Sequence, residues 1–170
     1  MTAVYFTADQ HFGHAGIIGL CKRPFRSVAE MDEAMIANWN AVVGPDDEVW
    51  HLGDFAYRIK RGRLTWIFAR LQGRKHLVSG NHDHDETLAL PWSSPPRQIA
   101  EVTIEGRRIV LCHYAMRAWP GQHKGALQLY GHSHGKLPGT PQSTDVGVDC
   151  WGFQPIRLDH IRVRLRQGRP

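Results

Sequence analysis

The chain has 170 residues, 42% of them hydrophobic, and a formal net charge of +5. This length and composition predict one domain, residues 1–170, with a substantial core, and no apolar run is long enough to cross a membrane. Residues 1–6 lack the basic start of a signal peptide, and Cys21, Cys112 and Cys150 stand at unrelated spacings, so we expect a cytoplasmic protein with free thiols.

Five short apolar runs are predicted strands because they are rich in β-branched and aromatic residues. They span residues 4–6, 49–52, 76–78, 109–112 and 127–130. Polar side chains follow each run, in the sets Asp9-Gln10-His11, Gly53-Asp54, Gly80-Asn81-His82-Asp83, His113 and Gly131-His132-Ser133-His134. In layered α/β folds ligands bind at the carboxyl ends of strands, so we expect these sets to converge.

Helical and hairpin signals lie between and after these runs. The segment 27–30, Ser-Val-Ala-Glu, is a capping box that predicts the start of a helix. Apolar residues at helical spacing predict a second helix, which ends at Gly73; they are Leu64, Ile67, Phe68 and Leu71. Glu105-Gly106 is a predicted hairpin turn between residues 99–104 and 108–112. Residues 161–166 alternate apolar and arginine, which predicts a half-buried strand.

The side chains at the strand ends indicate a metal site. Asp, Asn and His are hard or borderline ligands, and no cysteine stands among them. The set is larger than one ion requires, so we expect two divalent metals that share one carboxylate and act on a phosphoester. An imidazole suits the proton donor that the departing alkoxide needs near neutral pH.

The ordered motifs resemble those of the calcineurin-like metallophosphoesterase superfamily. The motifs Asp-x-His, Gly-Asp, Gly-Asn-His-Asp, His and Gly-His-x-His occur in this order between residues 9 and 134. The opening stretch, residues 9–14, also resembles a compact bacterial and phage branch of that superfamily. The resemblance implies an α/β fold: a four-layer α/β/β/α sandwich of two mixed sheets flanked by helices.

The resemblance also implies roles for individual residues. One metal would be held by Asp9, His11 and His134, and the other by Asn81, His113 and His132, with Asp54 bridging. His82 would contact the phosphate and protonate the leaving group, oriented by Asp83. Manganese is the favoured metal, and iron, zinc or nickel also suit these ligands. Tyr57 stands where the family often has Asp or Arg, which removes a usual phosphate contact.

Residues outside these motifs are weaker candidates. His14 follows the first set closely enough to contact substrate, with ordinary packing as the alternative. Arg117 is a candidate phosphate contact, and Trp119 either stacks a base or covers the core. The other histidines are expected to be structural or exposed; they are His51, His76, His84, His123 and His160. Residues 145–149 are expected to support the ligand loops from a further strand.

The expected function is hydrolysis of a phosphoester by a metal-bridging hydroxide, with His82 as general acid. A phosphodiester is favoured because so short a chain leaves little room for a cap domain that would bury a small metabolite. A nuclease or RNA-end-processing phosphodiesterase is one alternative, suggested by the positive charge and the C-terminal arginines. A non-catalytic interaction module is the other. The substrate, a nucleotide or nucleic acid among the candidates, and the oligomeric state stay open.

Overall fold

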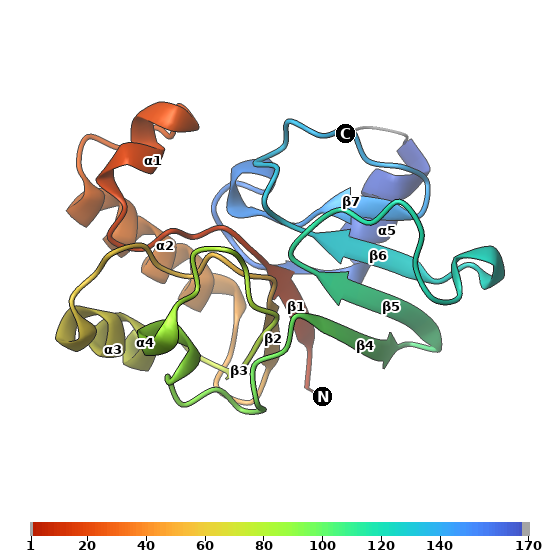
Figure 1. Cartoon of the computed structure of the whole chain (residues 1–170), viewed down its shortest axis with the longest axis horizontal. Helices are drawn as coiled ribbons and strands as arrows, with labels where there is room; N and C mark the ends of the chain where they lie inside the picture. The colour runs from red at the N-terminus through yellow and green to blue at the C-terminus, as the bar shows by residue number, and fades with distance from the viewer. Residues whose placement is uncertain (1, 168–170) are drawn as a thin grey trace.

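The computed structural model describes residues 2–167 (Figure 1) and contains two four-stranded mixed sheets. The first has the order β3-β2-β1-β8, in which β8 is antiparallel to β1 and the other pairs are parallel. Its strands are β1 Val4–Thr7, β2 Glu48–His51, β3 Arg74–Leu77 and β8 Ile156–Arg157. The second has the order β4-β5-β6-β7, with strands β4 Ile99–Ile104, β5 Arg107–Cys112, β6 Leu127–Tyr130 and β7 Ser143–Asp145.

All five strands predicted to precede metal-binding side chains are present, as β1, β2, β3, β5 and β6. The predicted hairpin is also present: β4 pairs antiparallel with β5, and Ile104 lies opposite Arg107. Both turn residues, Glu105 and Gly106, have a positive φ, as the tight turns of two-residue hairpins require.

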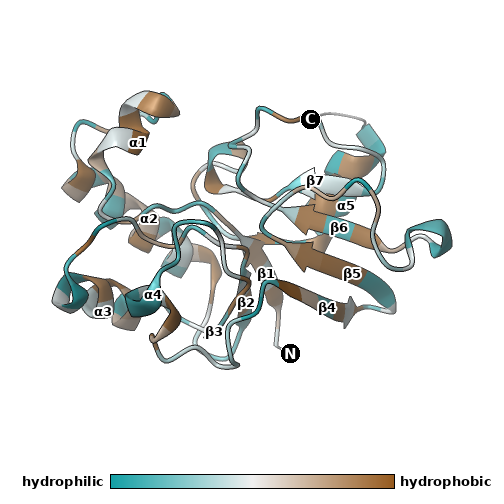
Figure 2. Ribbon diagram, in the orientation of Figure 1, coloured by the Kyte–Doolittle hydropathy of each residue, from teal (hydrophilic) through white to brown (hydrophobic). Residues whose placement is uncertain are grey.

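The core between the sheets follows from the period of two along each strand. Phe6 of β1 and Ile109 and Leu111 of β5 are fully buried in one hydrophobic cluster that joins both sheets. The next residues along these strands, Tyr5 and Val110, belong to clusters on the outer faces. Figure 2 shows the resulting pattern, with hydrophobic strands inside and hydrophilic loops outside. This alternation packs the sheets face to face.

Helices cover the outer face of the first sheet. They are α1 Ala15–Leu20, α2 Val28–Val42, α3 Arg61–Arg70 and α4 Asp85–Leu88. Met35 and Trp39 of α2 pack with Val49 of the sheet in one buried cluster. Ser27 caps α2 as predicted, because its hydroxyl accepts a hydrogen bond from the Glu30 N–H. The Glu30 carboxylate accepts a hydrogen bond from the Arg26 N–H and not from the Ser27 N–H that a capping box would use.

The second sheet is covered on its outer face by the segment that follows β5. The 3-10 helix η1 Gln122–Lys124 lies in this segment, and Trp119 and Ala126 pack against Val110 of the sheet. Helix α5 Leu158–Gln167 contacts β8, β1 and β7 and so closes the edge where both sheets end. The predicted fold class, two mixed sheets flanked by helices, is confirmed. No described helix is long and apolar enough to cross a membrane.

The prediction of a strand at residues 161–166 is wrong, because these residues form most of α5. Leu158 and Ile161 are buried and Leu165 packs against the same cluster, whereas Val163 is 51% exposed. Positions 158, 161 and 165 share one face of a helix, so the apolar residues satisfy a helical period as well as a strand period. The arginines consequently point in several directions rather than along one face.

Candidate functional site

The loops that leave the five predicted strands meet at one edge of the two sheets. The Asp9 N–H donates to the Gly53 carbonyl and the His11 N–H to the Asp54 carbonyl, both at 3.0 Å, so the loops after β1 and β2 run side by side. The Gly131 N–H donates to the His113 carbonyl, also at 3.0 Å, which joins the loops after β6 and β5. Residues far apart in the sequence therefore converge as the strand order requires.

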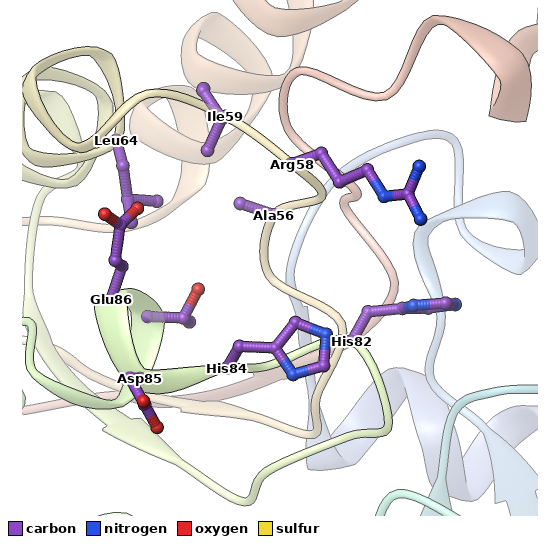
Figure 3. Close-up of a pocket in the computed structure, with 9 residues that line it drawn as sticks. Ala56, Arg58, Ile59, Leu64, His82, His84, Asp85 and Glu86 are labelled. Carbon is purple, nitrogen blue, oxygen red and sulfur yellow. The ribbon is translucent and has the colours of Figure 1, made fainter.

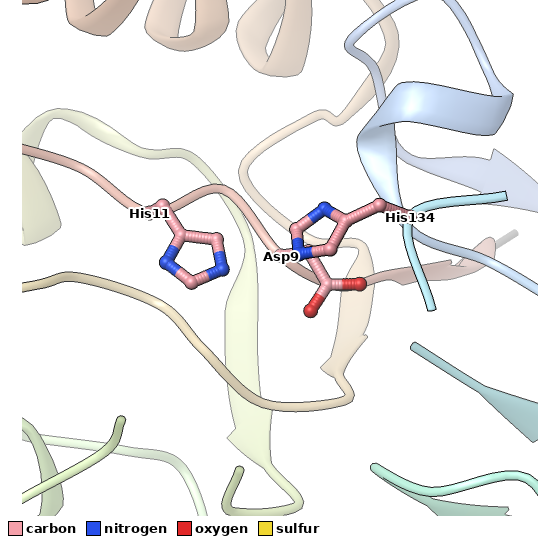
Figure 4. A group of neighbouring side chains, drawn as sticks. All are labelled: Asp9, His11 and His134. Carbon is pink, nitrogen blue, oxygen red and sulfur yellow. The ribbon is translucent and has the colours of Figure 1, made fainter. Parts of the chain in front are cut away.

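The first cluster of donor atoms consists of Asp9, His11 and His134, shown in Figure 4. One donor atom from each lies within 4.8 Å of the other two, and the rings of His11 and His134 stack at a centroid distance of 5.3 Å. Asp9 and His11 are buried, whereas His134 is partly exposed. These are the three residues that the resemblance assigns to one metal.

The second cluster consists of Asp54, His113 and His132, again within 4.8 Å of one another. The Asn81 Oδ1 atom lies 3.2 Å from His113 Nε2, which brings the fourth expected residue to the same place. Asp54 Oδ2 lies 3.5 Å from His113 Nε2 and 3.4 Å from His11 Nε2. One carboxylate oxygen thus faces both clusters, which is the position that a shared ligand needs.

The polar atoms of these clusters have the chemistry of a cation site. Both ring nitrogens of His11 are buried and have no hydrogen-bond partner among the described residues. The ring of His11 therefore has a nitrogen lone pair with no donor to accept from. Burial lowers the pKa of His11 to about 3, so the ring is neutral at neutral pH. Burial raises the pKa of the Asp9 carboxyl to about 7. A divalent cation would satisfy both groups, so the residues fit a metal.

Asp54 differs from Asp9 because its neighbours compensate its charge. Burial acts to raise the pKa of Asp54. Two neighbours outweigh burial: His113 through its hydrogen bond and positive charge, and His82 through the hydrogen bond that its backbone N–H donates. The pKa of Asp54 therefore falls below its ordinary value. The same contact works in reverse on His113: burial acts to lower its pKa, and the Asp54 carboxylate raises it overall. Asp54 is therefore ionised at neutral pH, as an anionic ligand between two cations must be.

The backbone at the site is strained. Nine described residues other than glycine have a positive φ, and five of them belong to the two clusters: Asp9, His11, Asp54, His132 and His134, with φ between 47° and 64°. Such a conformation costs about 1–3 kcal/mol per residue and persists only where the surroundings enforce it. Its concentration at these five positions indicates that the chain is held in place to aim their side chains inward.

Two glycines permit the close approach of the loops. A Cβ atom on Gly53, whose φ is +95°, would lie 2.5 Å from His113 Nδ1 and 2.6 Å from the Gly80 nitrogen. A Cβ atom on Gly80 would lie 2.7 Å from the Asp54 nitrogen. Positions 53 and 80, directly before Asp54 and Asn81, therefore require glycine, because no side chain fits between the loops.

A buried arginine, Arg23, supports the first cluster and was not singled out from the sequence. Its Nε and Nη2 atoms donate to the two oxygens of Asp149 at 2.8 Å, and its Nη1 and Nη2 atoms donate to the carbonyls of Gln10 and Asp9. Asp149 Oδ2 in turn lies 2.8 Å from His134 Nδ1. This chain of contacts fixes the orientation of His134 and leaves its Nε2 atom for a ligand.

We expect Arg23→Ala to lower the free energy of unfolding by about 3–5 kcal/mol, because it leaves the Asp149 carboxylate partly buried without its partner. The measurement is urea unfolding in the presence of a chelator, so that metal binding does not contribute. Arg70→Ala is the matched control: its ion pair with Glu33 is at the surface, and its loss should change the unfolding midpoint far less. Equal effects from the two variants would contradict the supporting role of Arg23.

Asp83, which is expected to orient His82, forms its hydrogen bonds with backbone groups of two loops. The Asp83 oxygens accept hydrogen bonds from the N–H groups of Asp54, Phe55 and Gly80, at 2.8, 2.9 and 2.8 Å. No hydrogen bond joins Asp83 to the His82 ring among the described residues. A buried carboxylate accepts hydrogen bonds from the N–H groups nearest to it. Asp83 therefore ties the loop after β3 to the loop after β2.

His82 lies at the entrance of the site beside two other rings. Its centroid is 5.5 Å from that of His11 and 4.9 Å from that of Tyr57, and its backbone N–H donates to Asp54 Oδ1 at 2.9 Å. The His14 ring is 4.1 Å from the Tyr57 ring and 5.3 Å from the His11 ring. The structure thus brings His14 and Tyr57 to the same side of the clusters as His82.

The remaining candidates are exposed or serve the fold. Arg117 is exposed in the loop after β5, and Trp119 is buried, donating its indole N–H to the Ala126 carbonyl. His51 is buried and paired with Gln10, and His76 contacts Ser94 Oγ and stacks on Trp50. His84, His123 and His160 are exposed. Residues 145–149 do support the ligand loops, since Asp145 accepts from Ser133 Oγ and the Gly135 N–H.

Two cavities flank the loop that carries Asn81 and His82. One, of about 220 Å³, is lined by His82 and His84 together with α3 and α4 residues (Figure 3). The other, of about 390 Å³, is lined by Asn81 and by residues that include Ile99, Cys112 and Tyr114. His82 and Asn81, which lie close to the clusters, thus each line one of these cavities.

Comparison with known proteins gives the same fold. No family model matches the chain. Gene 66 protein of Mycobacterium phage L5 is 40% identical, in an alignment that covers 89% of this chain and 89% of that protein. A solved structure of a protein of unknown function, AQ665 of Aquifex aeolicus, has a TM-score of 0.75 and 25% identity, over 95% of this chain and 98% of that one. An archaeal phosphodiesterase has a TM-score of 0.50 and 14% identity, over 86% and 82%.

The two flanked mixed sheets and the polar residues at their strand ends define a metallophosphoesterase fold. The chain belongs to the family of Gene 66 protein of Mycobacterium phage L5.

Proposed function

We propose that the protein is a metal-dependent hydrolase of phosphoesters, and that its substrate is a phosphodiester. The observation that carries this proposal is the position of Asp54 Oδ2, within 3.4–3.5 Å of an imidazole nitrogen from each cluster. A carboxylate between two sets of metal-ligating side chains favours two cations side by side, about 3.5–4 Å apart in enzymes of this kind. Manganese suits the ligand set, and iron, zinc or nickel would also bind it.

The residues assigned to metal binding divide by cluster. Asp9, His11 and His134 would hold one ion and Asn81, His113 and His132 the other, with Asp54 shared. When bound, such a pair of ions lowers the pKa of a water molecule and neutralises charge that develops on the phosphoryl oxygens. Arg23 and Asp149 would keep His134 in the orientation that this binding needs.

His82 would act as the proton donor. Water adds its oxygen to phosphorus, the bond from phosphorus to the alcohol oxygen breaks, and the electron pair of that bond stays on the alcohol oxygen. The His82 imidazolium gives its proton to this oxygen, and the proton released by the water restores the imidazolium. The products are one alcohol and one phosphomonoester. His82 lies beside the clusters and makes no side-chain hydrogen bond among the described residues, which leaves its ring available for this transfer.

The openness of the site supports a diester over a monoester. A diester carries two organic groups, and the cavities of about 220 and 390 Å³ provide space on both sides of the loop that carries His82.

The nuclease alternative gains no support from the C-terminal arginines: Arg162 pairs with Glu105, and Arg164 stacks on Trp151 and donates to the Cys150 carbonyl. Glu105 lies at the end of β5 opposite to His113, far along the strand from the clusters.

A screen of phosphoesters tests the proposed function. We expect the purified protein with Mn²⁺ to hydrolyse bis-p-nitrophenyl phosphate faster than p-nitrophenyl phosphate, with the Asp54→Asn variant as the blank. A cyclic phosphodiester and single-stranded DNA or RNA complete the series. Faster turnover of the monoester would exclude the diesterase, and cleavage of nucleic acid with a steep dependence on salt would favour the nuclease instead. A protein that binds no metal and hydrolyses none of them would be the non-catalytic module.

A further inference from the structure

The cavity beside His82 has a floor of apolar side chains. Ala56, Ile59 and Leu64 line it from the loop after β2 and from α3 (Figure 3). Ala56 and Leu64 are almost completely buried, so the floor belongs to the rigid core of the first sheet. At about 220 Å³ the cavity is smaller than the sites of whole drug-sized ligands, which begin near 300 Å³, and it suits a fragment of a molecule.

The walls of this cavity carry charge of opposite sign at its two ends. Figure 3 shows Arg58 and His82 on one side and Asp85 and Glu86 on the other. Asp85 and Glu86 begin helix α4 and are exposed, and neither forms an ion pair among the described residues. A group that enters beside His82 therefore passes over apolar surface and ends next to the unpaired carboxylate of Glu86, whereas the Asp85 side chain points away from the apolar floor in Figure 3.

We propose that this cavity binds the departing alcohol of the substrate and selects an uncharged or cationic alcohol over an anionic one. The inference rests on the proposed function, in which His82 gives its proton to the oxygen of that alcohol. Among the described cavities this is the one that His82 lines, so an alcohol whose oxygen lies beside His82 has room there for its remaining atoms. The acidic wall attracts a cation there and repels a carboxylate or a further phosphate.

This selection has a consequence for the class of substrate. A nucleic acid strand carries its next phosphate a few bonds beyond the cleaved one, which would bring negative charge toward Asp85 and Glu86. The substrate class is therefore a diester whose departing group is a single small alcohol, aryl or alkyl, neutral or positively charged. The group that stays on phosphorus would extend toward the cavity beside Asn81.

The test compares three aryl methyl phosphates whose departing phenols carry a trimethylammonio, a nitro or a carboxylate group. With Mn²⁺ present, we expect kcat/KM to be highest for the cationic phenol and lowest for the anionic one. The variant Glu86→Lys should lower the ratio of cationic to anionic kcat/KM by about 5-fold, the size expected for one exposed charge pair. An unaltered ratio would overturn the proposal.

Two matched variants separate the cavity from general charge effects. Asp46→Lys makes the same change of charge in an exposed loop at the far end of β2, and Gln98→Lys adds a positive charge at the cavity beside Asn81. Neither should change the ratio for the departing phenols. If Asp46→Lys lowered it as much as Glu86→Lys does, the preference would reflect the field of the whole protein and the cavity would have no specific role.

A binding measurement keeps this proposal distinct from the proposed function. Titration of the isolated phenols into the protein should shift the backbone amide signals of Ala56, Ile59 and Glu86 in nuclear magnetic resonance spectra, with the cationic phenol binding most tightly. This result with no hydrolysis of any ester would retain the cavity and refute the phosphoesterase. Hydrolysis without binding at these residues, or with the same rates for all three phenols, would retain the enzyme and refute the cavity.

Discussion

Replacing His82 by alanine should slow the hydrolysis of a diester with a poor leaving group by about 10²–10⁴-fold, the usual contribution of a positioned general acid. The metal content should stay the same, because the His82 ring belongs to neither donor cluster. The backbone N–H of residue 82 would still donate to Asp54 Oδ1, so the loop keeps its anchor. The measurement is kcat with alkyl and p-nitrophenyl diesters, together with metal analysis of the same preparation.

The dependence on the leaving group separates acid catalysis from simple damage to the site. A p-nitrophenolate leaves without much help from a proton, so its ester should lose far less rate in His82→Ala than an alkyl ester loses. His123→Ala removes an exposed histidine of η1 and should change neither rate. An equal loss for both leaving groups, or a loss of metal, would mean that His82 holds the site together and does not transfer the proton.

Replacing Asp54 by asparagine should have the opposite pattern, in which metal is lost first and activity falls with it. Asparagine keeps the size of the side chain but removes the negative charge that faces both His11 and His113. Loss of residues that only support a ligand reduces metal affinity about 10–100-fold, so loss of the shared ligand should exceed that range. The measurement is the number of Mn²⁺ ions retained per chain after dialysis, followed by activity as Mn²⁺ is added back.

Asp159→Asn is the control for this experiment, because Asp159 is an exposed aspartate at the start of α5. It should retain as much metal as the unaltered protein. If Asp54→Asn kept its full metal content and lost only activity, Asp54 would not be shared between two ions. The assignment of the two clusters would then have to be replaced by one ion and a separate catalytic carboxylate.

The secondary structure of the site was predictable because its signals are local. Each of the five strands is a short apolar run that stops at polar residues, and the hairpin turn at Glu105 and Gly106 has the required residues at the required places. The C-terminal segment was predicted wrongly because its apolar residues fit two periods. Packing of Leu158 and Ile161 against the sheet edges, which the local pattern does not contain, selects the helix.

The supporting contacts were not predictable in the same way. Arg23 and Asp149 are 126 residues apart and neither stands in a recognisable motif with the other. Asp83 is next to His82 in the sequence, yet its carboxylate binds backbone N–H groups on a loop 28–29 residues away. The positive φ of Asp9, His11 and Asp54 also has no local signal, because glycine is the residue that usually marks such a conformation.

The sequence by itself determined which side chains can bind metal, their order, and the strands that carry them, because residue type and short-range periodicity are local properties. The tertiary structure decided how these side chains are held: the position of Asp54 between His11 and His113, the Arg23–Asp149–His134 contacts, and the cavity between His82 and α4. These features depend on distances between segments far apart along the chain. Such distances are fixed only when both sheets pack together and bring their carboxyl ends to one edge.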